Sequence, residues 1–164
     1  MKILTLVRHA KSSWKNPGLR DIERPLNKRG RRDAPEMGRR IKDHGIRPSL
    51  IISSPAVRAW TTAKIIAAEI SYPQEFLQRE SGLYLASVDE ILDVIAAQDE
   101  GFNSLMVVGH NPGMTEFTNF LHSGLTNNLP TAGVVSVEID QDHWQLYERP
   151  PTKLLVHDYP KLEH

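Results

Sequence analysis

Three short apolar segments, each followed at once by polar residues, constrain the fold of this chain most strongly. They are residues 3–7 (ILTLV), 50–52 (LII) and 105–109 (LMVVG). Apolar runs of this length are typical of strands that are buried on both faces of a sheet. Helical patterns lie between them, and strands that alternate with helices predict an α/β fold with a mostly parallel sheet. We therefore expect a three-layer sandwich in which helices cover both faces of a central sheet.

Two helices are expected in the first half of the chain. One ends near Asp43, and because proline cannot donate a helical hydrogen bond, Pro35 predicts that this helix either starts near Asp33 or is kinked there. The other covers residues 55–69, since Ser54 is a favourable N-cap residue and proline is favoured at the first helical position.

The second half of the chain shows one strong helix signal and several weaker elements. Residues 87–98 have an apolar stripe at helical spacing, and Ser87 and Glu90 stand at the spacing of a capping box. The remaining expected elements are a weak strand at 74–79, a helix from Pro112 or Gly113 to about His122, and a strand pair at 134–139 and 143–147.

Length and composition fit one globular domain. The chain has 164 residues, the size of one ordinary domain, which we place at residues 1–161. The last three residues, 162–164, resemble the start of an expression tag and are expected to be a tag remnant. The chain has no cysteine, which excludes disulfides, thiolate nucleophiles and zinc–thiolate sites.

Net charge and hydropathy give no sign of a nucleic-acid or a membrane partner. The 20 basic and 20 acidic residues cancel, so net charge gives no general preference for nucleic acid or membrane. The apolar start is too short for a signal peptide, and no apolar run approaches the length of a membrane span. We therefore expect a cytoplasmic protein with no nucleic-acid and no membrane partner.

Basic residues are concentrated between Lys2 and Arg47. They predict either an ordinary solvated helix face or a positive rim that attracts an anionic substrate or an acidic partner. Composition does not decide between these two readings. The basic residues in this stretch are Lys11, Lys15, Arg20, Arg24, Lys28, Arg29, Arg31, Arg32, Arg39, Arg40 and Lys42.

Polar residues of one chemical kind follow the three apolar strands. Arg8 and His9 follow the first strand, Arg58 lies shortly after the second, and His110 follows the third. In open α/β sheets, ligands bind beyond the carboxyl ends of the strands. If these strands are parallel neighbours, two arginines and two histidines meet at one edge of the sheet.

This set of side chains is suited to phosphate chemistry. Two guanidinium groups can hold phosphate oxygens through paired hydrogen bonds, and a neutral histidine can attack phosphorus or donate to a phosphate oxygen. Each residue taken alone is more often structural. The coincidence of four such residues at three strand ends favours a functional site. The other histidines, His44, His122, His143 and His157, have no such context and are read as structural.

Three motifs in this order resemble the histidine phosphatase superfamily, which is also called phosphoglycerate-mutase-like. Residues 6–12 (LVRHAKS) are similar to its arginine–histidine signature, and residues 53–63 (SSPAVRAWTTA) to its second arginine motif. Residues 108–113 (VGHNPG) are similar to its second-histidine motif. The similarity extends from residue 1 to about residue 140. Within the superfamily, the short length and residues 21–26 (DIERPL) resemble the SixA-type phosphohistidine phosphatases.

The resemblance implies roles for individual residues. His9 would be the nucleophile, while Arg8, Arg58 and His110 would hold the phosphate. No cofactor and no metal are implied, because the arginines supply the positive charge. The expected substrate is phosphohistidine on a protein, with inorganic phosphate as the product. Lys11, Lys15 and Arg24, on the loop after the nucleophile, are either an outer wall of the substrate pocket or ordinary surface charges.

The sequence departs from the family pattern at two places. Ala10 replaces the glycine that usually follows the nucleophilic histidine. The family's mutases and ester phosphatases use an acidic residue in the middle of the chain, and Glu80 is the nearest candidate, although the surrounding residues 79–84 match poorly. A phosphate ester needs such an acid because it expels an alkoxide. Imidazole leaves phosphohistidine more easily, so the poor match suits that substrate.

Three alternative functions remain open. A phosphatase for small phosphate esters would need Glu80 as its acid. A phospho-ligand-binding module without turnover would need the arginines but not His9. A histidine metal site fits poorly because the adjacent arginines would repel a cation and no acidic residue completes a ligand set.

Overall fold

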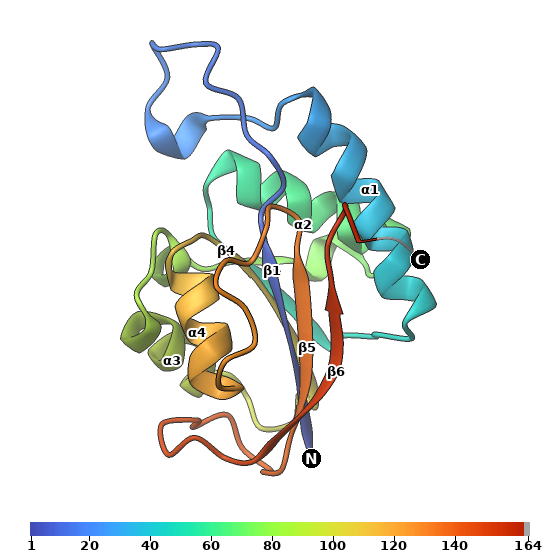
Figure 1. The fold of residues 1–164 in the computed structure, drawn as a ribbon, viewed down its shortest axis with the longest axis vertical. Helices are drawn as coiled ribbons and strands as arrows, with labels where there is room; N and C mark the ends of the chain where they lie inside the picture. The colour runs from blue at the N-terminus through green and yellow to red at the C-terminus, as the bar shows by residue number, and fades with distance from the viewer. Residues whose placement is uncertain (163–164) are drawn as a thin grey trace.

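The computed structural model describes residues 1–162 and shows a six-stranded sheet between two layers of helices (Figure 1). No helix among these residues is long and apolar enough to span a lipid bilayer. The strands are β1 (Lys2–Arg8), β2 (Leu50–Ser53), β3 (Gln78–Arg79), β4 (Ser104–Gly109), β5 (Val134–Ile139) and β6 (Thr152–Asp158). The helices are α1 (Lys28–Asp43), α2 (Val57–Glu69), α3 (Val88–Ala96) and α4 (Gly113–Leu121).

The sheet has the strand order β3-β2-β4-β1-β5-β6. The first four strands in this order pair in parallel, whereas β5 runs antiparallel to β1 and β6 runs antiparallel to β5. Helices α3 and α4 lie on one face and α1 and α2 on the other, as Figure 1 shows. The expected three-layer α/β sandwich with a mostly parallel sheet is confirmed.

Alternate residues of the central strands supply two separate cores. In β4, Leu105 and Val107 pack with α3 and α4, whereas Met106 and Val108 pack with α1 and α2. The same alternation holds in β2, where Ile51 and its neighbours face opposite layers. Because both faces are covered, these strands are apolar throughout, and this explains why the sequence shows continuous rather than alternating apolar runs.

Of the two alternatives for the first helix, a start near Asp33 is wrong. Helix α1 begins at Lys28, because the Asn27 side chain caps it by accepting a hydrogen bond from the Gly30 N–H (2.8 Å). Pro35 therefore lies inside the helix. Helix α2 begins at Val57, so Ser54 is not its N-cap residue. The capping box predicted for α3 is confirmed.

The predicted strand at 143–147 is also wrong, because β6 occupies residues 152–158 instead. The apolar residues in 143–147 are explained by a loop that turns into the core: Trp144 and Leu146 are both fully buried. The Trp144 indole N–H donates to the Phe102 carbonyl (2.9 Å). The weak strand predicted at 74–79 is reduced to two residues, preceded by a 3₁₀ turn.

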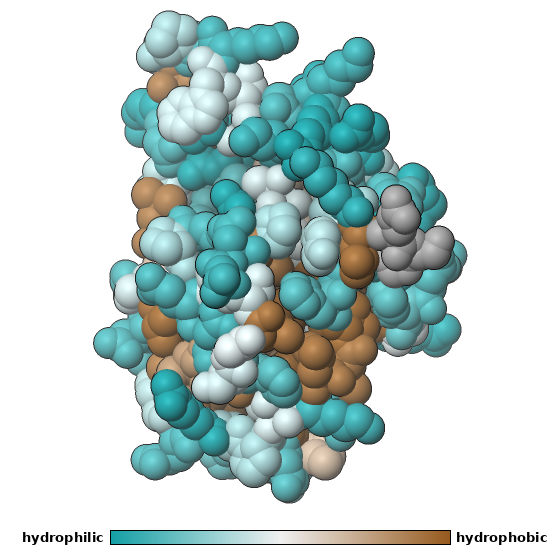
Figure 2. Space-filling view, in the orientation of Figure 1, coloured by the Kyte–Doolittle hydropathy of each residue, from teal (hydrophilic) through white to brown (hydrophobic). Residues whose placement is uncertain are grey.

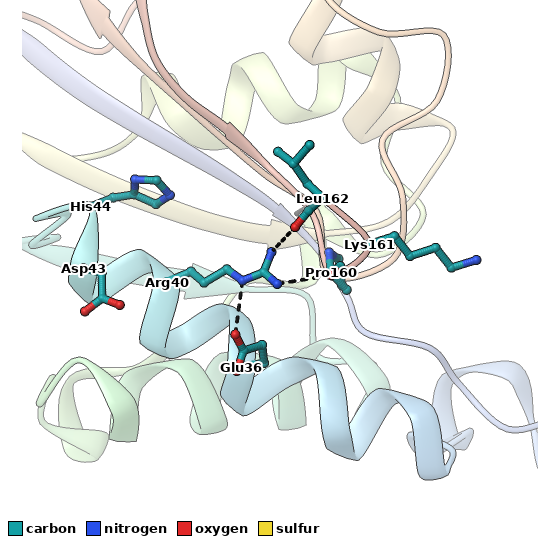
Figure 3. A pocket seen from close by; sticks show the side chains of 7 residues that line it. All are labelled: Glu36, Arg40, Asp43, His44, Pro160, Lys161 and Leu162. Atoms are coloured by element: carbon teal, nitrogen blue, oxygen red, sulfur yellow. Dashed lines mark hydrogen bonds and ion pairs between the residues drawn. The ribbon is translucent and has the colours of Figure 1, made fainter. Parts of the chain in front are cut away.

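Arg40 of α1 holds the segment that follows β6 (Figure 3). Its guanidinium group donates to Asp158 (3.1 Å) and to the carbonyls of Tyr159 (2.9 Å), Pro160 (3.2 Å) and Leu162 (3.3 Å). The groove beside this segment shares no lining residue with the cavity at the strand ends. Of the expected tag remnant, residues 163–164 lie outside the described residues.

The side chain of Lys2, at the start of β1, is buried, and its ammonium group is hydrogen-bonded to other residues of the protein. Its ammonium group donates to the carbonyls of Glu100 and Phe102 (2.9 Å to the latter) and to the Asn103 side-chain oxygen (3.0 Å). It also lies 5.4 Å from the centre of the Trp144 ring. One cation therefore fixes the loop before β4 to the first strand.

Substituting Lys2 should destabilise the fold. Lys2→Met keeps the apolar stem but removes the donor to the Glu100 carbonyl and to the Asn103 side-chain oxygen, whereas the Phe102 carbonyl still accepts from the Trp144 indole N–H. We expect a loss of about 1–3 kcal/mol in the free energy of unfolding. Denaturant unfolding would measure it. Lys153→Met, at an exposed position of β6, is the control and should change stability by less than about 0.5 kcal/mol. Equal effects of the two substitutions would show that the Lys2 contacts contribute nothing.

Candidate active site

The parallel pairing of β1 with β4 places the two candidate histidines side by side. Arg8 stands opposite Gly109 in the register, and the His9 N–H donates to the Gly109 carbonyl (3.0 Å). A histidine directly follows each of these two strands, and the centres of the two rings are 5.2 Å apart. Arg58, in the first turn of α2, reaches the same edge from beyond β2. The structure thus brings together all four residues that the sequence predicted at the strand ends.

These side chains line a cavity of about 170 Å³ at the carboxyl edge of the parallel strands. This is smaller than the roughly 300–1,000 Å³ of sites that enclose drug-sized ligands. Its lining consists of Arg8, His9, Lys11, Ser12, Trp14, Arg24, Arg58, Leu85, His110, Asn111 and Thr131. No carboxyl side chain is among these lining residues.

Of the four other residues that the sequence singled out, Lys11 and Arg24 line this cavity, whereas Lys15 and Glu80 do not. Lys15 is exposed on the loop that follows β1. Glu80 follows β3, where its backbone N–H donates to the Ser53 carbonyl (2.8 Å), and it is not part of the lining. Neither Lys15 nor Glu80 is therefore in position to contact a group bound inside the cavity.

His9 presents an unprotonated nitrogen. Its Nδ1 lies 2.7 Å from the Ala10 carbonyl oxygen, and because a carbonyl can only accept, Nδ1 carries the hydrogen and Nε2 has the lone pair. Burial, followed by the charges of Arg58 and Arg8, lowers the pKa of His9 to about 4, although the hydrogen bond to Ala10 opposes this shift. The ring is therefore neutral near pH 7 and can act as a nucleophile.

His110 is also neutral and is oriented by Ser54. Burial, together with the neighbouring His9 and Arg58, lowers the pKa of His110 to about 3. The Ser54 hydroxyl accepts from the Ala56 N–H (3.2 Å) and lies 2.7 Å from His110 Nε2, so it can donate its own hydrogen to that nitrogen. His110 Nδ1 would then carry a hydrogen, and among residues 1–162 this buried atom has no hydrogen-bond partner. It is thus available as a donor to a phosphate oxygen.

The three arginines of the cavity are each held by hydrogen bonds to oxygen atoms. Arg8 donates to the Leu129 carbonyl (3.0 Å). Arg58 donates to both the carbonyl (2.7 Å) and the carboxylate (2.9 Å) of Asp21. Arg24 donates to the carboxylate of Asp21 (2.9 Å), to the Ser12 hydroxyl and to the Ser13 carbonyl (3.1 Å). Side chains held in this way lose little further freedom when they bind an anion.

Asp21 is a site residue that the sequence did not reveal. Besides Arg58 and Arg24, its carboxylate accepts from the Tyr84 hydroxyl (2.6 Å). These hydrogen bonds, that of Tyr84 first, hold the pKa of Asp21 well below its usual range. Asp21 is therefore ionised and cannot supply a proton near neutral pH. Its position in the DIERPL segment was visible, but nothing local indicated that it joins three elements.

Thr62 of α2 was also missed. Its hydroxyl accepts from the Ala10 N–H (3.0 Å) and donates to the Arg58 carbonyl (2.7 Å). It thereby ties the residue after His9 to the helix that carries Arg58. A buried threonine inside a helix gives no sequence signal for such a role.

The basic stretch combines both readings that composition left open. On α1, Arg29 and Arg32 pair with Asp33, and Arg39 and Arg40 pair with Glu36, as on an ordinary solvated helix face. The loop before α1, in contrast, supplies Lys11 and Arg24 to the cavity. The arrangement as a whole can bind a tetrahedral oxyanion and place a neutral ring nitrogen beside it.

Comparisons with known proteins show which family the chain resembles in sequence. The model of the histidine phosphatase superfamily (branch 1) matches residues 4–81. An uncharacterised chloroplastic protein of Arabidopsis thaliana is 30% identical over 152 residues, which cover 87% of this chain and 68% of that protein.

Solved structures show the same fold over the whole chain. The SixA protein of Agrobacterium tumefaciens, named as a phosphohistidine phosphatase, is 30% identical with a TM-score of 0.82, covering 97% of this chain and 98% of that one. A protein histidine phosphatase SixA solved with tungstate is 20% identical with a TM-score of 0.79, covering 96% and 97%. The chain therefore belongs to the histidine phosphatase superfamily.

Proposed function

We propose that this protein is a metal-independent phosphatase that removes the phosphoryl group from phosphohistidine on a protein through a covalent intermediate on His9. The observation that carries the proposal is the composition of the cavity. Three arginines and two neutral histidines line it, but no carboxyl side chain does. The site is equipped to bind and transfer a phosphoryl group, yet it has no carboxylic acid to protonate an alkoxide.

In the first step, the lone pair on His9 Nε2 attacks phosphorus in line with the leaving nitrogen. The new N–P bond forms as the bond to the substrate imidazole breaks, and that imidazole keeps the electron pair. If its second ring nitrogen already carries a proton, it leaves as neutral imidazole and needs no acid. Arg8, Arg58 and His110 Nδ1–H stabilise the charge on the three equatorial oxygens.

In the second step, water attacks phosphorus and the N–P bond breaks. Its electron pair returns to His9 Nε2, and both hydrogens of the water leave with dihydrogen phosphate. While phosphorylated, the His9 ring carries a positive charge, and its Nδ1–H bond to the Ala10 carbonyl (2.7 Å) stabilises that charge. The same hydrogen bond fixes the tautomer that the first step requires.

The similarity to SixA proteins supports the choice of substrate. One of these, named as a phosphohistidine phosphatase, is 30% identical over nearly the full length of both chains. The exclusion of Glu80 from the cavity lining points the same way, because ester hydrolysis needs a proton donor beside the leaving oxygen.

The direct test compares a phosphoramidate with a phosphate ester. With EDTA present, we expect the wild type to release phosphate from phosphoimidazole and from a histidine-phosphorylated carrier protein much faster than from O-phosphoserine, an alkyl ester that must expel an alkoxide. His9→Ala should reduce both phosphoramidate activities by about 10³-fold or more, because it removes the nucleophile. Acid-labile ³²P on the wild-type protein would identify the intermediate.

Glu80→Gln is the matched control for the alternative ester phosphatase. It should change turnover of phosphoimidazole by less than about threefold, since Glu80 lies outside the cavity lining. Preferential hydrolysis of the ester, with a loss of about 10²-fold or more in Glu80→Gln, would contradict the proposal. Phosphate binding without turnover of either substrate would indicate a binding module.

A second prediction concerns the ionisation of the two histidines. Because the fold lowers the pKa of His9 to about 4 and that of His110 to about 3, both rings should stay neutral from pH 8 to pH 5. Long-range ¹H–¹⁵N NMR should show His9 with its hydrogen on Nδ1. The histidines of the unfolded chain titrate near pH 6.5. Between about pH 6.5 and pH 4, the unfolded chain therefore binds more protons than the folded chain. The free energy of unfolding should therefore fall as pH drops from about 6.5 to 4. A His9 midpoint near 6.5 would contradict this prediction.

A third prediction tests Asp21 as the residue that positions Arg58. Asp21→Asn keeps the size of the side chain but removes the charge that holds Arg58 and Arg24. We expect kcat/KM for phosphoimidazole and the affinity for orthovanadate to fall on the order of 10- to 100-fold, with the midpoint of thermal unfolding little changed. Glu23→Gln, on the same turn but paired with exposed Arg20, should behave like the wild type. Loss of stability without loss of vanadate affinity would mean that Asp21 only supports the fold.

A further inference from the structure

The small size of the cavity sets where the rest of a substrate must lie. A volume of about 170 Å³ accommodates a phosphoryl group and little more. The chain that carries a phosphorylated residue therefore rests outside, on the residues around the opening. If the proposed function holds, these residues decide which phosphorylated molecule is accepted.

Trp14 is one such residue. It lines the cavity, yet 74% of its surface is exposed. The guanidinium carbon of Arg24 lies 3.2 Å from the centre of its ring, so one face of the indole covers a buried arginine and the other is free to contact a partner. Exposed tryptophans are rare on protein surfaces and enriched in binding interfaces.

The loop that carries Trp14 is fixed at its base. The Ser13 N–H donates to the Pro25 carbonyl (2.8 Å), and the Asn27 N–H donates to the Lys11 carbonyl (2.9 Å). In Figure 1 this loop, between β1 and α1, extends beyond the carboxyl end of the sheet. A fixed, protruding loop holds the indole in place before a partner arrives, which lowers the entropic cost of binding.

Leu85 is a second exposed apolar residue in the lining of the same cavity. It is 54% exposed and has a φ of +49°, in the left-handed region that leucine rarely adopts. Both neighbours are anchored, since the Tyr84 hydroxyl donates to Asp21 and Ala86 is buried. The strained backbone thus turns an apolar side chain outward beside the site, and such strain is concentrated at functional positions.

The loop that carries Trp14 also carries exposed basic residues. Lys11 and Lys15 are exposed on the Trp14 loop, and within residues 1–162 neither forms an ion pair. Figure 2 shows mainly hydrophilic residues over the end of the molecule that carries this loop. Positive charge around an apolar contact favours a partner with acidic residues beside its own apolar patch.

We propose that Trp14 and Leu85, flanked by Lys11 and Lys15, form a docking rim for a folded protein domain that presents its phosphohistidine on an acidic surface. The rim binds the surface around the phosphohistidine, while the cavity holds the phosphoryl group. A small phosphoramidate can fill the cavity, but it has no attached protein surface to contact the exposed faces of Trp14 and Leu85.

Two substrates that differ only in the attached protein separate rim from cavity. The protein substrate is a histidine-containing phosphotransfer domain phosphorylated on its histidine, and the small one is phosphoimidazole. Trp14→Ala and Leu85→Asn should each raise KM for the domain about tenfold or more, the effect of losing one interface anchor, with a much smaller change in kcat/KM for phosphoimidazole. Trp14→Phe should keep KM for the domain close to the wild-type value.

Two further variants serve as controls. Lys15→Gln should weaken the dependence of the domain's kcat/KM on salt concentration, because it removes one of the attracting charges. Phe76→Ala removes another exposed aromatic residue (61%), one outside the cavity lining, and should change neither activity. Leu85 lies outside the Trp14 loop, so Leu85→Asn tests the rim even if Trp14→Ala disorders that loop. Asparagine also tolerates the positive φ at this position better than leucine.

Each outcome bears on the rim separately from the proposed function. An equal loss on both substrates would overturn the docking rim and show that Trp14 only holds Arg24. No loss on either substrate would also overturn it. A wild type that fails to cleave phosphoimidazole would instead refute the proposed function itself, whatever the variants show.

Discussion

The parallel pairing of β1 and β2 with β4 is the constraint on which the rest of the site depends. It fixes Arg8 opposite Gly109, so that His9 and His110 follow at the same level with ring centres 5.2 Å apart. A shift of one residue in this register would exchange the two faces of a strand that is buried on both sides. The packing of the two cores therefore also maintains the distance between the two histidines, without any direct bond between them.

The electrostatics of the site follow from placing several cations around neutral rings. Arg8, Arg58 and Arg24 all oppose protonation of His9, and burial opposes it further. In the proposed mechanism, the same charges that bind phosphate thus keep the His9 nucleophile unprotonated before phosphate arrives. Asp21 balances part of this charge, but it lies behind Arg58 and Arg24 and outside the cavity lining. It can therefore hold the guanidinium groups without competing with the phosphate or repelling it.

Local patterns predicted β1, β2 and β4 and the four residues near their ends because buried parallel strands are apolar throughout and stop abruptly at polar residues. The errors arose where a residue's partner is distant in sequence. Ser54 has the local signature of an N-cap, but His110 takes its hydroxyl. Trp144 alternates with polar neighbours as in a strand, although it packs into the core from a loop. Asp21 could not be recognised because its partners come from α2 and from the turn after β3.

The division between cavity and surroundings separates chemistry from selectivity. The proposed phosphoryl transfer uses only the arginines, the two histidines and a water molecule, and these groups occupy a space too small to distinguish one large substrate from another. Selectivity must then come from residues outside that space, which are free to change without disturbing the transfer. Arg24 connects the two regions, because one face of its guanidinium group is covered by Trp14 while its nitrogens reach Asp21 and Ser12. Contact of a partner with the indole would therefore act directly on a residue of the phosphate cavity.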